Sequence, residues 1–346
     1  MVSGMKKVLL TATLLATPAF AVSLQGAGAS FPYPLYLKYF AEYKKATGTE
    51  VSYQSIGSGG GQRQMLEQTV DFGATDGPMS DSDMAKAPDK NKILHIPTAL
   101  GAVVPIYNIP GVDASLKFDG KVLADIFSGK ITKWNDPALV KDNPELKGVM
   151  FPITIARRAD GSGTTFIFTD YLAKVSKTFS GTVGKGTTVN WPQTSIGGKG
   201  NDGVTSVVKQ TPGSIGYVEL IFAKQNNIDY GQVKNKAGKF IKADLKSITA
   251  AAASKPMSND TRVSITDASG AGSYPISGYT WILVYQNQDY GKQTEAKAKA
   301  VKNMLKWIVT DGQKLNEGLG YAELPEKAQK IAISLINGIK FGNKKL

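Results

Sequence analysis

Cysteine is absent from this chain of 346 residues, and histidine occurs once, as His95. The lack of cysteine excludes disulfides, thiolate nucleophiles and thiolate metal ligands, and it also excludes a lipid anchor on a processed cysteine. His95 lies in an apolar stretch near Pro97, which is more typical of a packed side chain than of a catalytic base. The sequence has neither an acidic cluster with metal-ligand spacing nor a G-x-S-x-G motif. We therefore expect a protein that is not an enzyme and that needs no metal or other cofactor.

Long apolar runs are missing as well. The run Val8 to Ala16 is far shorter than the ~20 residues that a membrane-spanning helix needs. It follows Lys6 and Lys7 and precedes Ala19-Phe20-Ala21, an arrangement typical of a signal peptide with an A-x-A cleavage site. We expect residues 1–21 to be removed and the mature chain to be a periplasmic protein without a lipid anchor.

Acidic residues are fewer than basic ones, 28 against 41, and the formal net charge is +13. Without Lys6 and Lys7 the charge is +11, which can attract anions, nucleic acid or an acidic membrane face. The lysines are scattered, with no run of five like charges, and this is also typical of an ordinary solvated surface. We expect no nucleic-acid partner.

The length of the mature chain, about 325 residues, suggests two domains.

The hydrophobic pattern predicts an alternation of strands and helices joined by glycine-rich loops. Aromatic residues recur at helical spacing in residues 33–46, and Gly48 ends that helix. An Ala/Ser/Lys-rich stretch, 249–255, is expected on the surface. Repeated strand–loop–helix units predict an α/β fold. Further expected elements are strands at 50–54, 71–76, 153–157 and 279–285, a short helix around Met65, a helix with Phe168 and Leu172, and two closing helices with Leu305 and with Ala328, Ile331 and Leu335.

Three expected helix starts combine small and hydroxylated residues: Ala29-Ser30-Phe31, Gly57-Ser58-Gly59 and Ser162-Gly163-Thr164. The first N–H groups of a helix are free and its N-terminus carries a partial positive charge, so it can bind an anion. Serine and threonine are also the preferred N-caps, so each start has an ordinary structural explanation. Neither G-x-x-x-x-G-K-[ST] nor G-x-G-x-x-G is present at these places, and a nucleotide is not indicated.

Two charged groups follow expected strands. An arginine in Arg157-Arg158 could place two donors on an oxyanion, and Asp160 could hold its guanidinium, although a surface Arg–Asp pair is an equally simple explanation. Asp76 follows another strand, and a carboxylate beside an anion is tolerated only where a proton lies between them. Asp76 would then favour a protonated anion such as hydrogen phosphate over sulfate, or it is a turn residue before Gly77-Pro78.

Taken together, these stretches resemble the periplasmic phosphate-binding protein of the bacterial high-affinity phosphate ABC transporter, a family of type II periplasmic solute-binding proteins. The resemblance extends from Leu24 to the C-terminus. Its strongest parts are 26–32, 53–61, 70–80, 157–165, 197–203 and 213–219. No single stretch is specific for this family, but the six stretches together are.

The resemblance implies a two-lobed α/β fold with mixed sheets flanked by helices and a ligand cleft between the lobes. Lobe 1 would comprise residues 22–98 and 276–346, and lobe 2 residues 99–275. The implied function is capture of inorganic phosphate and its delivery to the membrane permease of an ABC transporter, by a protein that acts as a monomer. The implied phosphate contacts are Ser30, Phe31, Ser58 and Asp76 from the first lobe and Arg158, Ser162, Gly163 and Thr164 from the second, with Asp160 holding Arg158.

Three alternatives remain at this level. A phosphatase or phosphotransferase could use the same anion cradle, although the missing base and metal ligands argue against it. The ligand could be another tetrahedral oxyanion, such as arsenate, sulfate or molybdate. The protein could also be a surface adhesin or a phosphate-dependent sensor instead of a transport component.

Overall fold

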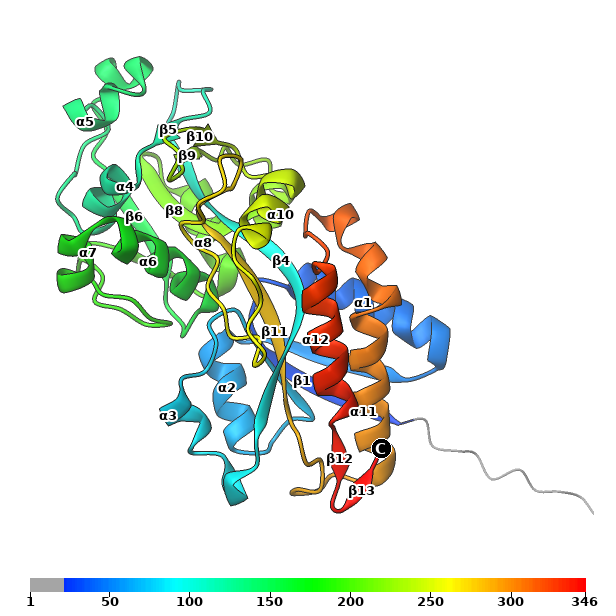
Figure 1. Cartoon of the computed structure of the whole chain (residues 1–346). Coiled ribbons are helices and arrows are strands. Elements are labelled where there is room, and N and C mark those ends of the chain that lie inside the picture. The colour runs from blue at the N-terminus through cyan, green and yellow to red at the C-terminus, as the bar shows by residue number, and fades with distance from the viewer. Residues whose placement is uncertain (1–21) are drawn as a thin grey trace, which may run out of the picture.

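Two α/β lobes joined by extended strands make up the computed structural model, which describes residues 22–346 (Figure 1). The expected signal peptide, residues 1–21, lies outside the described residues. The α/β, two-lobed fold expected from the sequence is confirmed.

Lobe 1 is built around three parallel strands near the N-terminus and the two long helices near the C-terminus. Strand β1 pairs with β2 on one side and with β3 on the other. Its strands are β1 (Ser23–Gly28), β2 (Glu50–Ser55), β3 (Phe72–Thr75), β12 (Lys340–Phe341) and β13 (Lys344–Lys345). Its helices are α1 (Tyr33–Thr47), α2 (Ser58–Leu66), α3 (Asp81–Met84), α11 (Glu295–Ile308) and α12 (Glu326–Asn337).

Lobe 2 contains the middle of the chain, and its main strands are again parallel, with β6 between β8 and β7. Its strands are β5 (Lys117–Phe118), β6 (Thr154–Arg158), β7 (Ile196–Gly198), β8 (Ser214–Glu219), β9 (Gln232–Lys234) and β10 (Phe240–Ile241). Its helices are α4 (Gly120–Phe127), α5 (Pro137–Val140), α6 (Gly163–Val175), α7 (Lys177–Thr182), α8 (Gly200–Gln210), α9 (Leu220–Gln225) and α10 (Leu245–Ala253).

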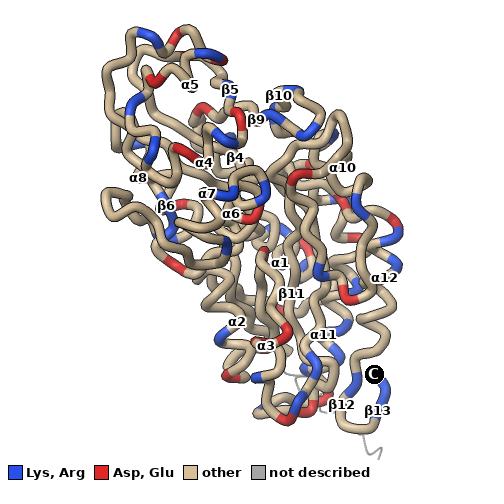
Figure 2. Tube along the Cα trace, turned by 60° about the vertical axis from the view of Figure 1, so that its left-hand side comes forward, with Lys and Arg blue, Asp and Glu red and all other residues tan. Residues whose placement is uncertain are grey.

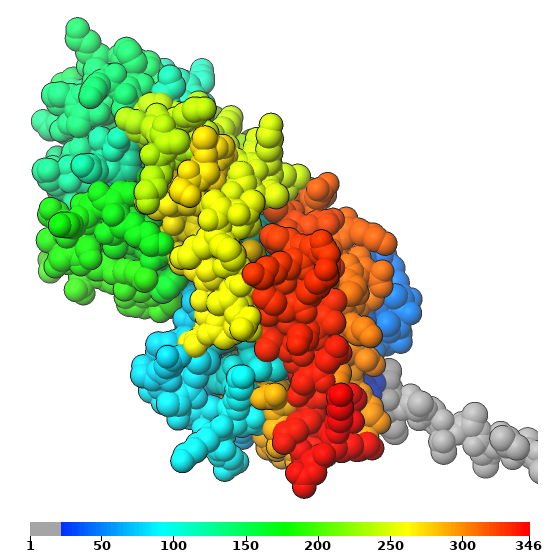
Figure 3. Space-filling view, viewed as in Figure 1, coloured from blue at the N-terminus to red at the C-terminus, as the bar shows by residue number. Residues whose placement is uncertain are grey.

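The strand β4 (Ile93–Asn108) belongs to both lobes. It pairs antiparallel with β11 (Ser277–Tyr285) as far as Ala102 and with β8 from Val103 onward. The strand order is therefore continuous through the molecule, β2-β1-β3-β11-β4-β8-β6-β7. Figure 1 shows β4 and β11 side by side in the middle of the molecule, and in Figure 3 the segment after α10 covers the junction of the lobes on the face shown.

The local signals of the sequence explain several of these elements. In α1, the residues Leu35, Tyr36, Tyr39, Phe40 and Tyr43 are buried at helical spacing, and Gly48 ends the helix in the left-handed conformation. Every residue of β11 is buried, as is expected of a central strand with helices on both faces of its sheet.

Two details differ from the sequence-based expectation. The stretch 249–255 is not simply a surface segment, because α10 turns Ile248, Ala251 and Ala252 into the core. In α12 the buried stripe contains Ala328, Ala332 and Ile336, so it is rotated by about one residue from the expected face. In both helices the alanines are small enough to suit either environment, which makes the burial pattern ambiguous in the sequence.

Basic and acidic residues are interspersed along the backbone of both lobes (Figure 2). None of the described helices combines the length and the apolar composition that a bilayer crossing requires.

Candidate functional site

The predicted contact residues come together where the two lobes meet. Helix α2 begins at Ser58 and α6 at Gly163, with Ser162 as its N-cap, while Ser30 lies between β1 and α1. All eight predicted contact residues are buried, including Gly163. The relative exposure of the other seven is 3% or less: Ser30, Phe31, Ser58, Asp76, Arg158, Ser162 and Thr164. The sequence-based set is therefore one buried cluster, formed by helix starts and strand ends from both lobes.

The guanidinium of Arg158 is fixed by lobe 2 itself. Its Nε donates to Oδ1 of Asp160 at 2.8 Å, its Nη2 donates to Oδ2 of the same carboxylate, and its Nη1 lies 3.3 Å from the Thr164 hydroxyl. Burial alone would raise the pKa of Asp160, but the bonds to Arg158 and to the main-chain N–H of Gly200 hold that pKa below its usual value. Arg158 and Asp160 therefore form an ion pair in which the guanidinium is buried and the carboxylate is partly buried, unlike an ordinary surface pair.

Two of the contacts that join the lobes directly lie at the starts of α2 and α6. The main-chain N–H of Gly163, in lobe 2, donates to the Ser58 hydroxyl of lobe 1 at 3.0 Å. The N–H of Gly59 donates to the carbonyl of Gly161 at 2.9 Å. A side chain on Gly57, where φ is +86°, would lie 2.1 Å from the Asp160 carboxylate. The lobes are therefore in contact at the site, and glycine is needed where the backbones approach.

Asp76 is the acidic group of the cluster. Its Oδ1 accepts a hydrogen bond of 2.8 Å from Thr280, its Oδ2 lies 3.4 Å from the Ser58 hydroxyl, and its main-chain N–H donates to that hydroxyl at 3.2 Å. Burial raises the pKa of Asp76 to about 7, although Thr280 and the charge of Arg158 oppose the shift. Asp76 is thus a buried acceptor close to an arginine, and not a solvated turn residue.

Two residues of the cluster were not predicted from the sequence. Asn201, in the first turn of α8, donates from Nδ2 to the hydroxyls of Ser30 and Thr164 at 2.9 and 3.1 Å. Thr280, in β11, reaches Asp76. Their only signals were that Asn201 falls in the resemblance stretch 197–203 and that Thr280 lies in an expected strand; neither signal gives the direction of a side chain.

Outside this cluster, the described residues offer few groups for metal ligation or acid–base catalysis. Among the described residues, no three His, Asp or Glu side chains are placed to hold a metal ion. His95 is buried, its Nε2 accepts a hydrogen bond from the N–H of Met79, and burial lowers its pKa to about 3. His95 is a packed residue, as the sequence predicted.

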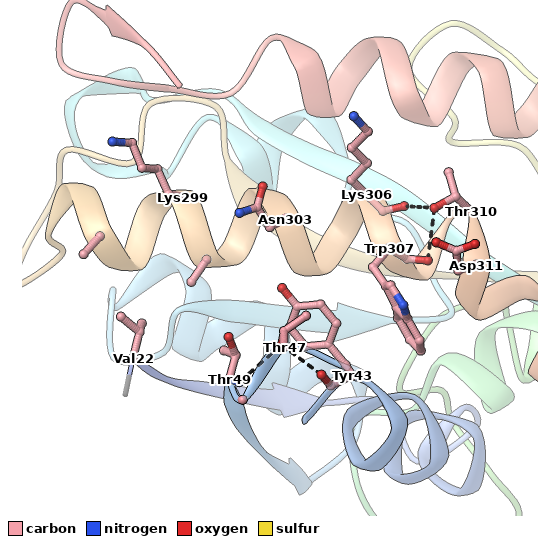
Figure 4. A pocket seen from close by; sticks show the side chains of 13 residues that line it. Val22, Tyr43, Thr47, Thr49, Lys299, Asn303, Lys306, Trp307, Thr310 and Asp311 are labelled. Carbon is pink, nitrogen blue, oxygen red and sulfur yellow. Dashed lines mark hydrogen bonds between the residues drawn. The ribbon is translucent and has the colours of Figure 1, made fainter. Parts of the chain in front are cut away.

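A separate surface pocket of about 720 Å³ lies between α1 and α11 (Figure 4). Tyr43, Trp307 and Thr47 line it, and the hydroxyls of Thr47 and Thr310 in its wall donate to main-chain carbonyls of α1 and α11, respectively. It contains none of the predicted contact residues.

The sequence and the fold both have close counterparts. Residues 15–312 match the family described as the PBP superfamily domain. The phosphate-binding protein PstS of Xylella fastidiosa (strain Temecula1) is 44% identical over 315 residues, covering 90% of this chain and 84% of that protein. PstS of Pasteurella multocida (strain Pm70) is 43% identical over 336 residues, covering 94% of each.

Solved structures share the fold at lower identity. A high-affinity periplasmic phosphate-binding protein bound with phosphate superposes with a TM-score of 0.71 at 20% identity, covering 93% of this chain and 100% of that chain. A phosphate-binding protein from Stenotrophomonas maltophilia gives a TM-score of 0.68 at 19% identity, covering 90% of this chain and 93% of the other.

Proposed function

This chain belongs to the PstS family of phosphate-binding proteins, and on that premise we propose that it captures inorganic phosphate between its lobes and delivers it to the membrane permease of an ABC transporter. The observation that carries the proposal is the buried cluster at the lobe junction, which brings donors from both lobes together with one carboxyl group, that of Asp76. A tetrahedral anion held there would touch both lobes at once, so binding would favour the closed arrangement.

The donors are of three kinds. Arg158 supplies a charged fork, which is held in place by Asp160. The hydroxyls of Ser30, Ser58, Ser162 and Thr164 supply neutral donors. The main-chain N–H groups of Phe31 and Gly163 complete the set, with the anion replacing Ser58 as the acceptor of Gly163. Helix N-termini add a favourable partial charge.

Asp76 would accept the proton of hydrogen phosphate. Its carboxyl group is buried, so in its ionised form it would leave a ligand without a proton beside an unrelieved negative charge. This supports phosphate, or the nearly isosteric arsenate, over sulfate.

We assign lobe 1 to residues 22–98 and 276–346 and lobe 2 to residues 99–275, with the chain crossing through β4 and returning before β11. The long, doubly paired β4 supports such a division. Residues 1–21 act in this proposal as a signal peptide that directs the protein to the periplasm, where it works as a monomer.

The family is one of substrate-binding proteins, and we propose further that this member has no catalytic activity. The proposal is supported by the state of His95 and by the lack of a metal-binding group among residues 22–346. Nucleic acid is not a partner in this account, since the charges are interspersed (Figure 2).

Calorimetric titration tests the function. Protein stripped of bound anion should bind phosphate with one site per chain and bind sulfate far more weakly. A protein that binds sulfate as well as phosphate, or neither, would rule out the proposal. Release of phosphate from a phosphomonoester, with or without divalent metal, would show that catalysis had been wrongly dismissed.

A further inference from the structure

Asn201 is the one side chain in the cluster that contacts a hydroxyl from each lobe. Its Nδ2 donates to Ser30 of lobe 1 and to Thr164 of lobe 2, and its main-chain N–H also donates to Ser30, at 3.1 Å. Asn201 has no exposed surface.

The orientation of the Asn201 amide is determined by its other end. Oδ1 accepts a hydrogen bond of 2.9 Å from the main-chain N–H of Glu219 at the end of β8. A main-chain N–H can only donate, so the oxygen must face β8 and the NH₂ group must face the two hydroxyls. Both hydrogens of the NH₂ group are then used, one on each hydroxyl.

The consequence concerns the hydroxyl protons. A hydroxyl oxygen has one hydrogen to donate and two lone pairs. Ser30 accepts two hydrogen bonds, both from Asn201, and Thr164 accepts one from Asn201 and one from Arg158. With their lone pairs occupied, these two hydroxyls have only their hydrogens left to offer.

We propose that Asn201 is a positioning residue that sets the hydroxyls of Ser30 and Thr164 as hydrogen-bond donors toward the anion and couples this setting to the contact between the lobes. The inference rests on the proposed function, since it specifies how two of its donors are oriented. Asn201 acts through the two hydroxyls and need not touch the ligand itself.

Two substitutions separate the parts of this role. Asn201→Leu keeps the approximate shape of the side chain and removes its polar group. The affinity for phosphate should fall roughly 10- to 100-fold, which is the loss expected when hydrogen bonds to a charged group are weakened. Asn201→Asp keeps the acceptor for Glu219 but replaces the donor with a second acceptor, and the loss should be larger still. This nearly isosteric variant keeps the test open if the leucine variant does not fold.

A matched control is available in lobe 2. Asn143 is also buried, and its Oδ1 accepts from the N–H of Lys117 while its Nδ2 donates to main-chain carbonyls. Asn143→Asp should destabilise the protein, as measured by thermal unfolding, without changing the affinity for phosphate.

A double-mutant cycle distinguishes positioning from a purely structural role. In a Ser30→Ala/Thr164→Val background the hydroxyls are gone, so adding Asn201→Leu should change the phosphate affinity less than about threefold, because coupled residues are not additive. Titrations carried to millimolar phosphate give the four affinities. An equal loss in both backgrounds, or an Asn201→Asp variant within threefold of the unsubstituted protein, would overturn the inference. Failure of the unsubstituted protein to bind phosphate would instead overturn the proposed function.

Discussion

At the scale of single residues, the proposed site combines a buried cation with a buried carboxyl group. Arg158 is held by Asp160 in lobe 2, and Asp76 is held by Thr280 in lobe 1. Neither charge is free to turn toward water, so an anion that enters meets groups that are already oriented, which lowers the cost of binding.

Removing the guanidinium should therefore be costly. Arg158→Ala is expected to weaken phosphate binding by about 2–5 kcal/mol, since it takes a charged partner from a desolvated anion. Calorimetry against the neighbouring Arg157→Ala is the comparison, because Arg157 bonds to Ser195 and to the carbonyl of residue 158 instead. Equal affinities for the two variants would remove Arg158 from the site.

Asp76 should control the choice between anions. Asp76→Asn replaces one acceptor oxygen with a donor and removes the negative charge, so sulfate should be rejected less strongly relative to phosphate. Competition between the two anions measures the ratio. If the ratio is the same in both proteins, Asp76 does not sense the proton of the ligand.

Asp76 also makes a prediction about pH. Its pKa is about 7 in the folded protein and near 3.8 in the unfolded chain, so between these values the folded state holds a proton that the unfolded state has lost. Its contribution to the free energy of unfolding is therefore present below pH 4 and decreases as the pH rises through 7.

Thermal or denaturant unfolding of the anion-free protein across this range measures the trend. Glu219 is also buried with a raised pKa, so the difference between the original protein and Asp76→Asn isolates Asp76. As the pH rises, the free energy of unfolding of the original protein should fall relative to that of Asp76→Asn. A difference in the free energy of unfolding that is independent of pH would contradict the raised pKa.

At the scale of elements, the N-terminus of α6 has two roles. Ser162 stabilises the start of the helix, and it is also a proposed phosphate contact. Ser162 caps it by accepting a hydrogen bond of 3.0 Å from the N–H of Thr165. Ser162→Ala should cost about 1 kcal/mol of stability as a lost cap, and should also weaken phosphate binding.

The next helix supplies the control for this change. Ser176 caps α7 in the same way, through the N–H of Phe179, and contacts no proposed ligand residue. Ser176→Ala should lower the unfolding temperature to a similar degree and leave the affinity unchanged. A parallel loss of affinity in both variants would mean that helix stability, and not the hydroxyl, is responsible.

Local sequence patterns predicted those residues of the proposed site whose positions are set by residues nearby in the sequence. Ser58, Ser162 and Arg158 follow from a strand end or a helix start, where the positions of the backbone groups are set locally. Asn201 and Thr280 depend on pairings across 171 and 204 residues, which hydrophobic periodicity does not encode. The resemblance to a family was needed to choose Arg158 over Arg157, because strand alternation shows only that they point to opposite faces.

At the scale of the whole molecule, phosphate binding should require that the lobes close. Gly57→Ala introduces a Cβ that would lie 2.1 Å from the Asp160 carboxylate of the other lobe, in addition to the strain of a positive φ. The affinity for phosphate should fall by at least about tenfold if the clash costs the ~1.4 kcal/mol that this factor represents.

Gly48→Ala separates strain from closure. Gly48 also has a positive φ, +75°, but nothing lies within 4 Å of an added Cβ, so this variant should lose stability without losing affinity. Small-angle scattering with and without phosphate should then show compaction for Gly48→Ala and a smaller change for Gly57→Ala. Full affinity and full compaction in Gly57→Ala would contradict the closure described here.

The central claim is that one anion lies between the lobes and touches both. The most direct measurement is a crystal structure of the protein loaded with phosphate. The account predicts tetrahedral density within hydrogen-bonding distance of Arg158 and Thr164 on one side and of Ser30, Ser58 and Asp76 on the other. Density that contacts a single lobe, or that lies outside this cluster, would contradict it.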